Sequence, residues 1–244
     1  GRAEMKKLRI VIQYECVTSF KYIWLFYAIE YAIVLLIAVV VALCTGAMEH
    51  VGSNCLEINT MIYAAVLGVL GFHEDFKMLI QNGFTRRYIY LATLSMFAFI
   101  SGIMALVDTV MGNGLHYFLN GYSSMYGAIY GYYHFFANWL WLFLLYMLVC
   151  SLLYLVGLAV NRYGKRILLY SGAALLGLVL IVTAMFRYIL PGEIARSVLN
   201  FLAGAMGFMS DGTKHLGLPL LTLFLIAALL ELGAYAVIRR TELR

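Results

Sequence analysis

The sequence predicts an all-α integral membrane protein with six transmembrane helices, and three observations lead to this prediction. Hydrophobic residues make up 64% of the 244 residues and charged residues only 12%, whereas water-soluble proteins carry about 25% charged residues. The apolar residues gather in six runs, and a helix needs roughly 20 such residues to cross a bilayer. None of the runs alternates polar and apolar residues with a period of two, so a membrane β-barrel is not expected.

Each run is expected to be a helix, because backbone groups inside lipid must find their hydrogen bonds within the chain. The second run is the shortest, and its ends are the least defined. The expected spans cover residues 22–44, 58–73, 88–110, 134–160, 167–186 and 216–238. Together they predict a single transmembrane domain over residues 1–244.

The basic residues predict how the chain is oriented. Five lie before the first span, and three each lie in the link between spans two and three, in the link between spans four and five, and at the C-terminus, so 14 of the 17 are on one side. The other side holds Arg187, Arg196 and Lys214. This positive-inside pattern predicts a multi-pass protein of the inner (cytoplasmic) cell membrane with both termini in the cytoplasm. The net charge of +5 is spread along these inner segments and does not indicate a nucleic-acid partner.

Residues 5–21, which precede the first span, are expected to form an amphipathic helix in the inner interface. Leu8, Val11, Ile12 and Glu15 share one face of such a helix, and bases dominate its start. A frayed, charged tail is the alternative, and the apolar spacing favours the helix.

Two outer segments carry features of their own. Cys44 and Cys55 flank the first outer loop, where they either form a disulfide or are ordinary small apolar residues, because sequence fixes no geometry. Residues 187–215 begin with a turn at Pro191–Gly192. Apolar residues then recur at spacings of three and four, which predicts an outer amphipathic or re-entrant segment before the sixth helix.

The link between the second and third spans is expected to hold a short transverse helix on the cytoplasmic side. Phe76, Leu79 and Ile80 follow helical spacing and make one apolar stripe. Glu74 and Asp75 lie in the first turn, where the helix dipole favours acids.

The end of this link also has helix-ending and helix-starting signals. Gly83 suits a left-handed C-terminal cap and Thr85 can cap the next helix. Arg86 and Arg87 would then lie at the inner headgroups. A helix that rests on lipid is the alternative, but such helices carry mainly Lys and Arg on the polar face. Here that face is mixed, which favours a protein partner; it consists of Glu74, Asp75, Lys77, Gln81 and Asn82.

The order of these elements, with GFTRRY at 83–88, resembles the permease of a type-2 ATP-binding-cassette (ABC) exporter. It is similar to membrane subunits of Gram-positive peptide exporters, including lantibiotic-immunity and phenol-soluble-modulin exporters. The resemblance covers the whole topology, but its specific signature is confined to residues 74–88. It implies that residues 74–87 form the coupling helix, which docks on the ATPase. The residues implied to contact the ATPase are Glu74, Asp75, Phe76, Lys77, Leu79, Ile80, Gln81, Gly83, Thr85 and Arg86.

The resemblance implies outward transport of amphipathic peptides or other hydrophobic cargo, with lipid surrounding the chain. The sequence contains no G-x-x-x-x-G-K-[ST] phosphate loop, so the chain is not expected to be an enzyme or to hold a cofactor. A separate ABC ATPase subunit that binds ATP and Mg is therefore implied. Six spans also imply a second copy of the permease, or a homologue, to complete a twelve-span unit.

Polar residues inside the predicted spans are candidates for a substrate path. Glu30 lies about 12 Å inside span one and Glu231 about 10 Å inside span six, counted from the cytoplasmic end at ~1.5 Å per residue. Their similar depth predicts a shared acidic lining for a cationic substrate; snorkelling or a hydrogen bond between helices is the alternative. Asn138 is the third candidate, although it also suits a contact between helices. Asp108 is expected to be interfacial.

Two other functions compete with export. An ion-coupled secondary carrier would use Glu30 and Glu231 as proton sites, but the sequence lacks inverted repeats and helices broken in mid-span by Gly or Pro. An intramembrane protease would need a serine near Ser123 and Ser124 and a mid-span histidine, and the histidines lie elsewhere. No spacing of Cys and His predicts a metal site.

Overall fold

The structure is a bundle of long helices. It is a computed structural model that describes residues 2–46, 54–70, 76–81, 83–118, 121–189 and 191–239. Within these ranges every regular element is a helix, apart from an isolated β-bridge between Phe208 and Lys214. Five of the helices are long and apolar enough to cross a membrane. The prediction of an all-α membrane protein is thereby confirmed.

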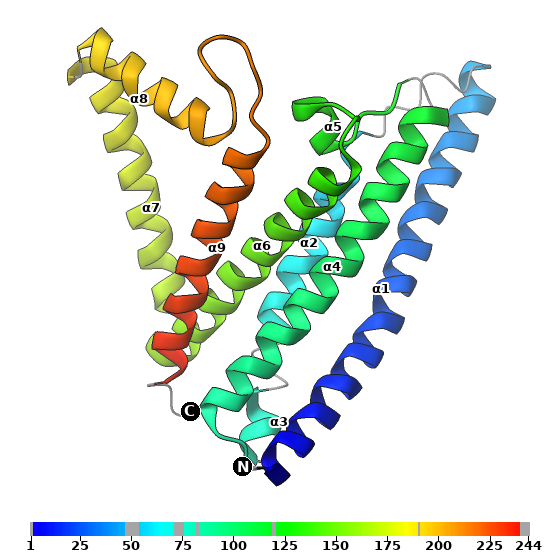
Figure 1. The fold of residues 1–244 in the computed structure, drawn as a ribbon, viewed down its shortest axis with the longest axis vertical. Coiled ribbons are helices and arrows are strands. Elements are labelled where there is room, and N and C mark those ends of the chain that lie inside the picture. The colour runs from blue at the N-terminus through cyan, green and yellow to red at the C-terminus, as the bar shows by residue number, and fades with distance from the viewer. Residues whose placement is uncertain are drawn as a thin grey trace.

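Helix α1 (Arg2–Thr45) joins the expected interfacial helix and the first span in one element without a break (Figure 1). The segment 5–21 is helical as predicted, but it continues into the span instead of turning away from it. Residues 5–44 contain neither Gly nor Pro, the usual causes of a sharp kink. The predicted apolar face is used, since Leu8 and Ile12 pack against the buried core.

Helices α2 (Glu57–Leu70) and α3 (Phe76–Gln81) are both short. Helix α2 has 14 residues, fewer than the roughly 20 that span a bilayer. The rest of the expected second span, 71–73, lies outside the described residues. Helix α3 lies at the end of the bundle that holds the N-terminus (Figure 1).

Helices α4 (Arg86–Phe118) and α6 (Phe135–Tyr163) form the centre of the bundle. Helix α6 contacts α2, α4, α7 and α9, and α4 also packs on α1. The contact between α2 and α6 depends on Gly68: a Cβ there would lie 2.7 Å from the Cys150 carbonyl oxygen. Small residues at such crossings let two membrane helices approach closely.

The C-terminal third adds α7 (Arg166–Ala184) with a π-helical extension (Met185–Ile189), then α8 (Gly192–Ala205) and α9 (Gly217–Ile238). Helix α7 has no buried residue and leans away from the centre of the bundle (Figure 1). Helix α8 crosses the end opposite the termini, and it begins after the turn predicted at Pro191 (Figure 1).

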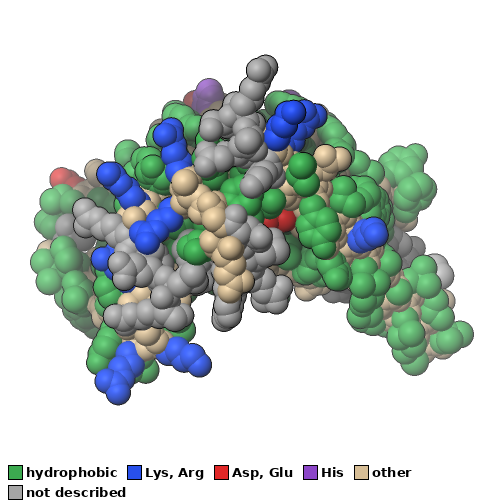
Figure 2. Space-filling view, turned by 90° about the horizontal axis from the view of Figure 1, so that it is seen from below, with side chains coloured by type: hydrophobic (Ala, Val, Ile, Leu, Met, Phe, Trp, Pro, Cys, Tyr) green, Lys and Arg blue, Asp and Glu red, His purple; other side chains and the backbone are tan. Residues whose placement is uncertain are grey.

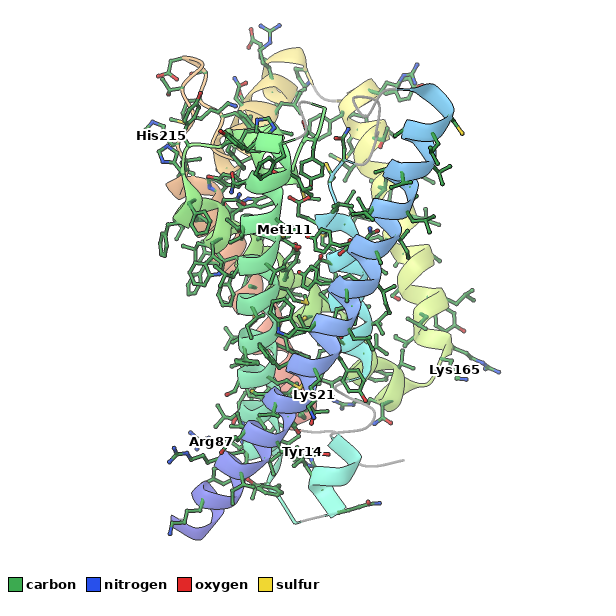
Figure 3. All side chains as sticks on the ribbon, turned by 90° about the vertical axis from the view of Figure 1, so that its right-hand side faces the viewer. Tyr14, Lys21, Arg87, Met111, Lys165 and His215 are labelled. Atoms are coloured by element: carbon green, nitrogen blue, oxygen red, sulfur yellow. The ribbon has the colours of Figure 1, made fainter. Side chains whose placement is uncertain are left out.

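Both described ends of the chain lie at the same end of the bundle (Figure 1). Seen from that end, Lys and Arg side chains gather on the surface (Figure 2). Arg87 lies toward this end and His215 toward the other (Figure 3). The fold therefore separates a basic end, with α3 and the termini, from the opposite end, formed by α5 (Met125–Tyr130) and α8, which is called outer only because it lies away from the termini.

Candidate functional site

The link between α3 and α4 ends in a defined backbone turn. Gly83 has φ of +78°, and its N–H donates to the Ile80 carbonyl at 2.9 Å. The Phe84 N–H donates to the Leu79 carbonyl at 3.1 Å. These two bonds form a Schellman motif, so the predicted left-handed cap is confirmed. A Cβ at Gly83 would meet nothing within 4 Å, so the backbone angle, not crowding, requires glycine here.

Helix α3 is fixed to the bundle by one side. Leu79 is only 1% exposed and belongs to the central core, and Ile80 packs against that core. Gln81, which directly follows Ile80, is exposed. The part of the predicted apolar stripe that the structure describes, Leu79 and Ile80, therefore faces protein.

The structure describes some of the other residues predicted to contact the ATPase only in part, and two of them not at all. Glu74 and Asp75 lie outside the described residues, and for Phe76 and Lys77 the structure describes the backbone of α3 but not the side chains. Thr85 is exposed and directly precedes α4, where its carbonyl accepts the Ile89 N–H at 3.1 Å. Its capping by the side-chain hydroxyl stays a prediction.

Two sets of contacts join the start of α4 to the basic end of α9. The Arg86 guanidinium donates from Nη1 to the Arg239 carbonyl at 2.9 Å. This places a cation at the C-terminal end of α9, where the helix dipole is negative and a positive charge is stabilising. The Tyr90 hydroxyl lies 2.8 Å from Oε2 of Glu231 and 3.1 Å from its carbonyl oxygen. The rings of Tyr90 and Tyr235 pack at 5.2 Å. These contacts attach the start of α4, which follows α3, to the C-terminal part of α9.

Glu231 also closes one side of an apolar groove between α4, α6 and α9. The groove has a volume of about 610 Å³, and its lining includes Leu94, Phe143 and Phe224. Glu231 accepts a second hydrogen bond from the Ser151 hydroxyl of α6. The Ser151 hydroxyl also lies 2.7 Å from the Met147 carbonyl, so its one proton is shared between two acceptors, and Tyr90 is the donor whose proton goes to Glu231 alone. These contacts join Glu231 of α9 to α4 and α6.

A second acidic site lies deep between α1, α2, α4 and α6. Asp108, predicted to be interfacial, is only 4% exposed, and it accepts a hydrogen bond from the Tyr146 hydroxyl. The hydroxyls of Tyr27 and Thr60 also face it. The interfacial prediction was wrong because Asp108 continues the buried stripe of α4, which repeats every three or four residues.

Two further acids lie close to Asp108. Glu30 accepts a hydrogen bond from Nδ2 of Asn59 at 3.0 Å, and Oε1 of Glu57 accepts the Met125 N–H at 3.1 Å. Both are more than nine-tenths buried, and the second carboxyl oxygen of each has no hydrogen-bond partner. Glu57 interacts electrostatically with both Glu30 and Asp108.

The depths of Glu30 and Glu231 differ, contrary to the sequence-based expectation. The Tyr27 hydroxyl donates to the Met104 carbonyl, and Glu30 lies almost one turn beyond Tyr27. Glu231 instead contacts Tyr90, which precedes Met104 by 14 residues of α4. That distance is roughly 21 Å along the helix axis. In the described structure the two acids therefore lie at different depths, and their roles in a substrate path stay predictions.

The reason for the difference is the starting point of α1. The expected depth counts from residue 22, whereas the apolar stretch of α1 begins at Leu8. Met111, one turn beyond Asp108, lies in the half of the bundle toward His215 (Figure 3). Glu30, Glu57 and Asp108 thus belong to the half of the bundle away from the basic end.

Asn138 lies apart from both acidic sites. It is buried in the first turn of α6, and its Oδ1 atom has no hydrogen-bond partner. Ser151, which binds Glu231, follows it by 13 residues, or roughly 20 Å along the same helix. The three polar residues predicted for one path are therefore separate in the described structure.

The serines considered for a protease have structural contacts. The Ser124 side chain accepts the Gly127 N–H at 3.1 Å and caps α5, while the Ser123 N–H donates to Oδ1 of Asn54. All four cysteines are free, so Cys44 and Cys55 form no disulfide. Among the described residues, no group of three His, Cys, Asp or Glu could hold a metal ion.

Sequence reasoning missed the hydroxyl partners of the acids. Tyr146 and Ser151 lie five residues apart on α6, and Tyr90 is near the start of α4. These residues are common in membrane helices, so no local pattern singles them out. Only Asp108 had a usable signal, because its spacing from Met104 and Ala105 matches the face that α4 buries.

Comparison with protein-family models, with curated proteins and with solved structures found no match for this chain.

Proposed function

We propose that this chain is the permease subunit of an ATP-driven, type-2 ABC exporter that moves amphipathic peptides or other hydrophobic cargo outward across the cytoplasmic membrane. One observation carries the proposal: a short helix at the basic end, α3, is anchored by Leu79 and closed by the glycine turn at Gly83. This is the arrangement that a docking element between two spans requires. The resemblance of residues 74–88 to coupling helices gives the partner's class.

The contacts around α4 supply a route from docking to transport. Arg86 holds the C-terminal end of α9, and Tyr90 holds Glu231 beside the apolar groove. A force on α3 reaches these residues through the four-residue link into α4. The groove would then widen or narrow as α4 moves against α9.

The proposed membrane topology has six spans and both termini in the cytoplasm. Helix α2 would be the second span along the chain and would bring the total from five to six, with residues beyond Leu70 completing it. The basic end would face the cytoplasm. The missing phosphate loop calls for a separate ATPase subunit, which would bind ATP and Mg. A second copy of this chain, or a homologue, would complete the transport unit.

Charge reversal in the coupling helix tests this proposal. Lysine at both Glu74 and Asp75 is expected to weaken co-purification of the proposed ABC ATPase subunit, while membrane insertion stays normal. A matched control is Glu193→Lys in α8, which reverses an acid in the first turn of a helix at the opposite end. Unchanged co-purification in the double variant would reject the docking role.

An ion-coupled carrier is the second candidate, and the buried acids near Asp108 favour it. Carriers bind coupling ions at ionisable residues buried within the membrane. The two candidates differ in their energy source. Transport by the reconstituted chain with its ATPase should need ATP in the first case, and an ion gradient without ATP in the second.

A further inference from the structure

We propose that the Asp108 cluster, made of Glu30, Glu57, Thr60 and Asp108 with the hydroxyls of Tyr27 and Tyr146, is a proton-binding site. The proposal is independent of how transport is energised, and it applies to both candidate functions. It assigns the cluster a ligand, the proton, and a place, the outer half of the bundle between α1, α2, α4 and α6.

The first argument is the absence of a countercharge. Glu30, Glu57 and Asp108 are each at most 7% exposed, and no ion pair joins any of them to a described Lys, Arg or His. Three neighbouring carboxylates in such a site repel one another and lose their hydration. A proton on the cluster removes both penalties.

The second argument comes from hydrogen-bond donors. The Tyr27 hydroxyl gives its one proton to the Met104 carbonyl, so only its lone pairs remain for the Asp108 carboxyl it faces. Thr60 is fully buried and also faces Asp108, yet its Oγ1 makes no hydrogen bond of ordinary geometry. The Tyr27 oxygen is therefore an acceptor that a protonated carboxyl would satisfy, whereas the Thr60 hydroxyl can donate to Asp108 or accept from it and fits either form.

The orphan oxygens of the other two acids agree with this account. Oε2 of Glu30 and Oε2 of Glu57 are buried without any donor, although the opposite oxygen of each is bonded. A neutral carboxyl tolerates such an oxygen far better than a carboxylate does. The other titratable groups that face the cluster are phenols and a thiol, and none is a base at neutral pH: Tyr27, Tyr31, Tyr122, Tyr146 and Cys55.

Labelling with dicyclohexylcarbodiimide tests the site, because this apolar reagent adds to protonated carboxyls in dry surroundings. The full chain in lipid nanodiscs would be treated at a series of pH values and the adducts mapped by peptide mass spectrometry. We expect an adduct on Glu30, Glu57 or Asp108 at neutral pH that falls roughly tenfold per pH unit once the site loses its proton. The exposed Glu193 and Asp211 are internal controls and should stay unlabelled.

Variants and a second readout keep the test decisive. Replacing the labelled acid, by Asp108→Asn, Glu30→Gln or Glu57→Gln, should remove its adduct and the infrared carbonyl band of a protonated carboxyl. If that variant does not fold, the band in the wild-type chain shows whether the cluster is protonated. Absence of both adduct and band at neutral pH would overturn the proposal. Protection by sodium ions without any pH dependence would also overturn it, because the ligand would then be a metal cation.

Discussion

Side-chain hydroxyls make the main polar bonds between helices in this bundle. Tyr90 and Ser151 bond Glu231, and Tyr146 bonds Asp108. Each bond joins helices that are distant in sequence, by 141, 80 and 38 residues. Where lipid surrounds the chain, these donors replace water for the carboxyl groups.

Removing one such donor should cost measurable stability. Tyr90→Phe keeps the ring that packs on Tyr235 but deletes the bond to Glu231. We expect a loss of about 1 kcal/mol, since bonds to charged groups give roughly 1.5–3 kcal/mol in water and bonds between membrane helices average ~0.6 kcal/mol. Thermal unfolding in detergent measures it. Tyr170→Phe on exposed α7 should be neutral, and equal losses in both variants would contradict the account.

The outer loop after α8 contains a pH-sensitive turn. The Thr213 hydroxyl and N–H both donate to Oδ1 of Asp211, and these bonds lower the pKa of the Asp211 carboxyl below its ordinary value. A lowered folded-state pKa means that the stabilisation is present above about pH 4 and is lost as the pH falls through the folded pKa. Hydrogen exchange in residues 209–214 should therefore rise at acidic pH, and Asp211→Asn should abolish that rise.

At the scale of elements, close packing decides which helices stay together. The α2–α6 contact allows no side chain at Gly68, whereas nothing lies within 4 Å of a Cβ at Gly172 in α7. Helix α7 buries no residue, so its neighbours set few constraints on it. The bundle therefore has a tightly packed centre, to which α9 belongs, and a loosely attached α7.

A pair of glycine substitutions should separate these two regions. Gly68→Ala must displace α2 from α6, because the added Cβ would lie 2.7 Å from the Cys150 carbonyl oxygen. We expect a loss of about 1–3 kcal/mol in the free energy of unfolding, the usual cost of overpacking. Gly172→Ala should be neutral or stabilising, since Ala favours helices over Gly. A neutral Gly68→Ala would show that the contact is looser than the structure has it.

The sequence predicted most elements because their signals are local. Runs of apolar residues placed the long helices, Gly83 placed the turn after α3, and Pro191 placed the start of α8. The continuity of α1 was missed because an amphipathic segment and an apolar run meet without a helix breaker. The burial of Asp108 and the different depths of Glu30 and Glu231 were not predicted, because the depth of a residue depends on how far its helix is shifted along its neighbours. Counting residues from an assumed membrane edge does not give that shift.

At the scale of the whole molecule, the basic end and the outer half carry different chemistry. The basic end joins α3, α4 and α9 through Leu79, Arg86 and Tyr90. The outer half holds the Asp108 cluster and the capped turn before α5. These regions share the long helices α4 and α6, which connect the two ends of the bundle.

Glu30 and Glu231 should therefore act independently. Each contacts a different set of partners, Asn59 for the first and Tyr90 with Ser151 for the second. Distant substitutions usually add to within about 0.5 kcal/mol. The stability losses of Glu30→Gln and Glu231→Gln should sum in the double variant. A coupling energy well above that value would indicate a shared cavity.

ATP turnover measured with and without the ATPase partner tests the central claim most directly. The chain alone in nanodiscs should hydrolyse no ATP, and its complex with the proposed ABC ATPase subunit should hydrolyse ATP at a rate that lysine at Glu74 and Asp75 lowers several-fold. The lysine variant of Glu193 should match the wild-type complex. Robust turnover by the isolated chain, or a complex unaffected by the changes at 74 and 75, would contradict the account.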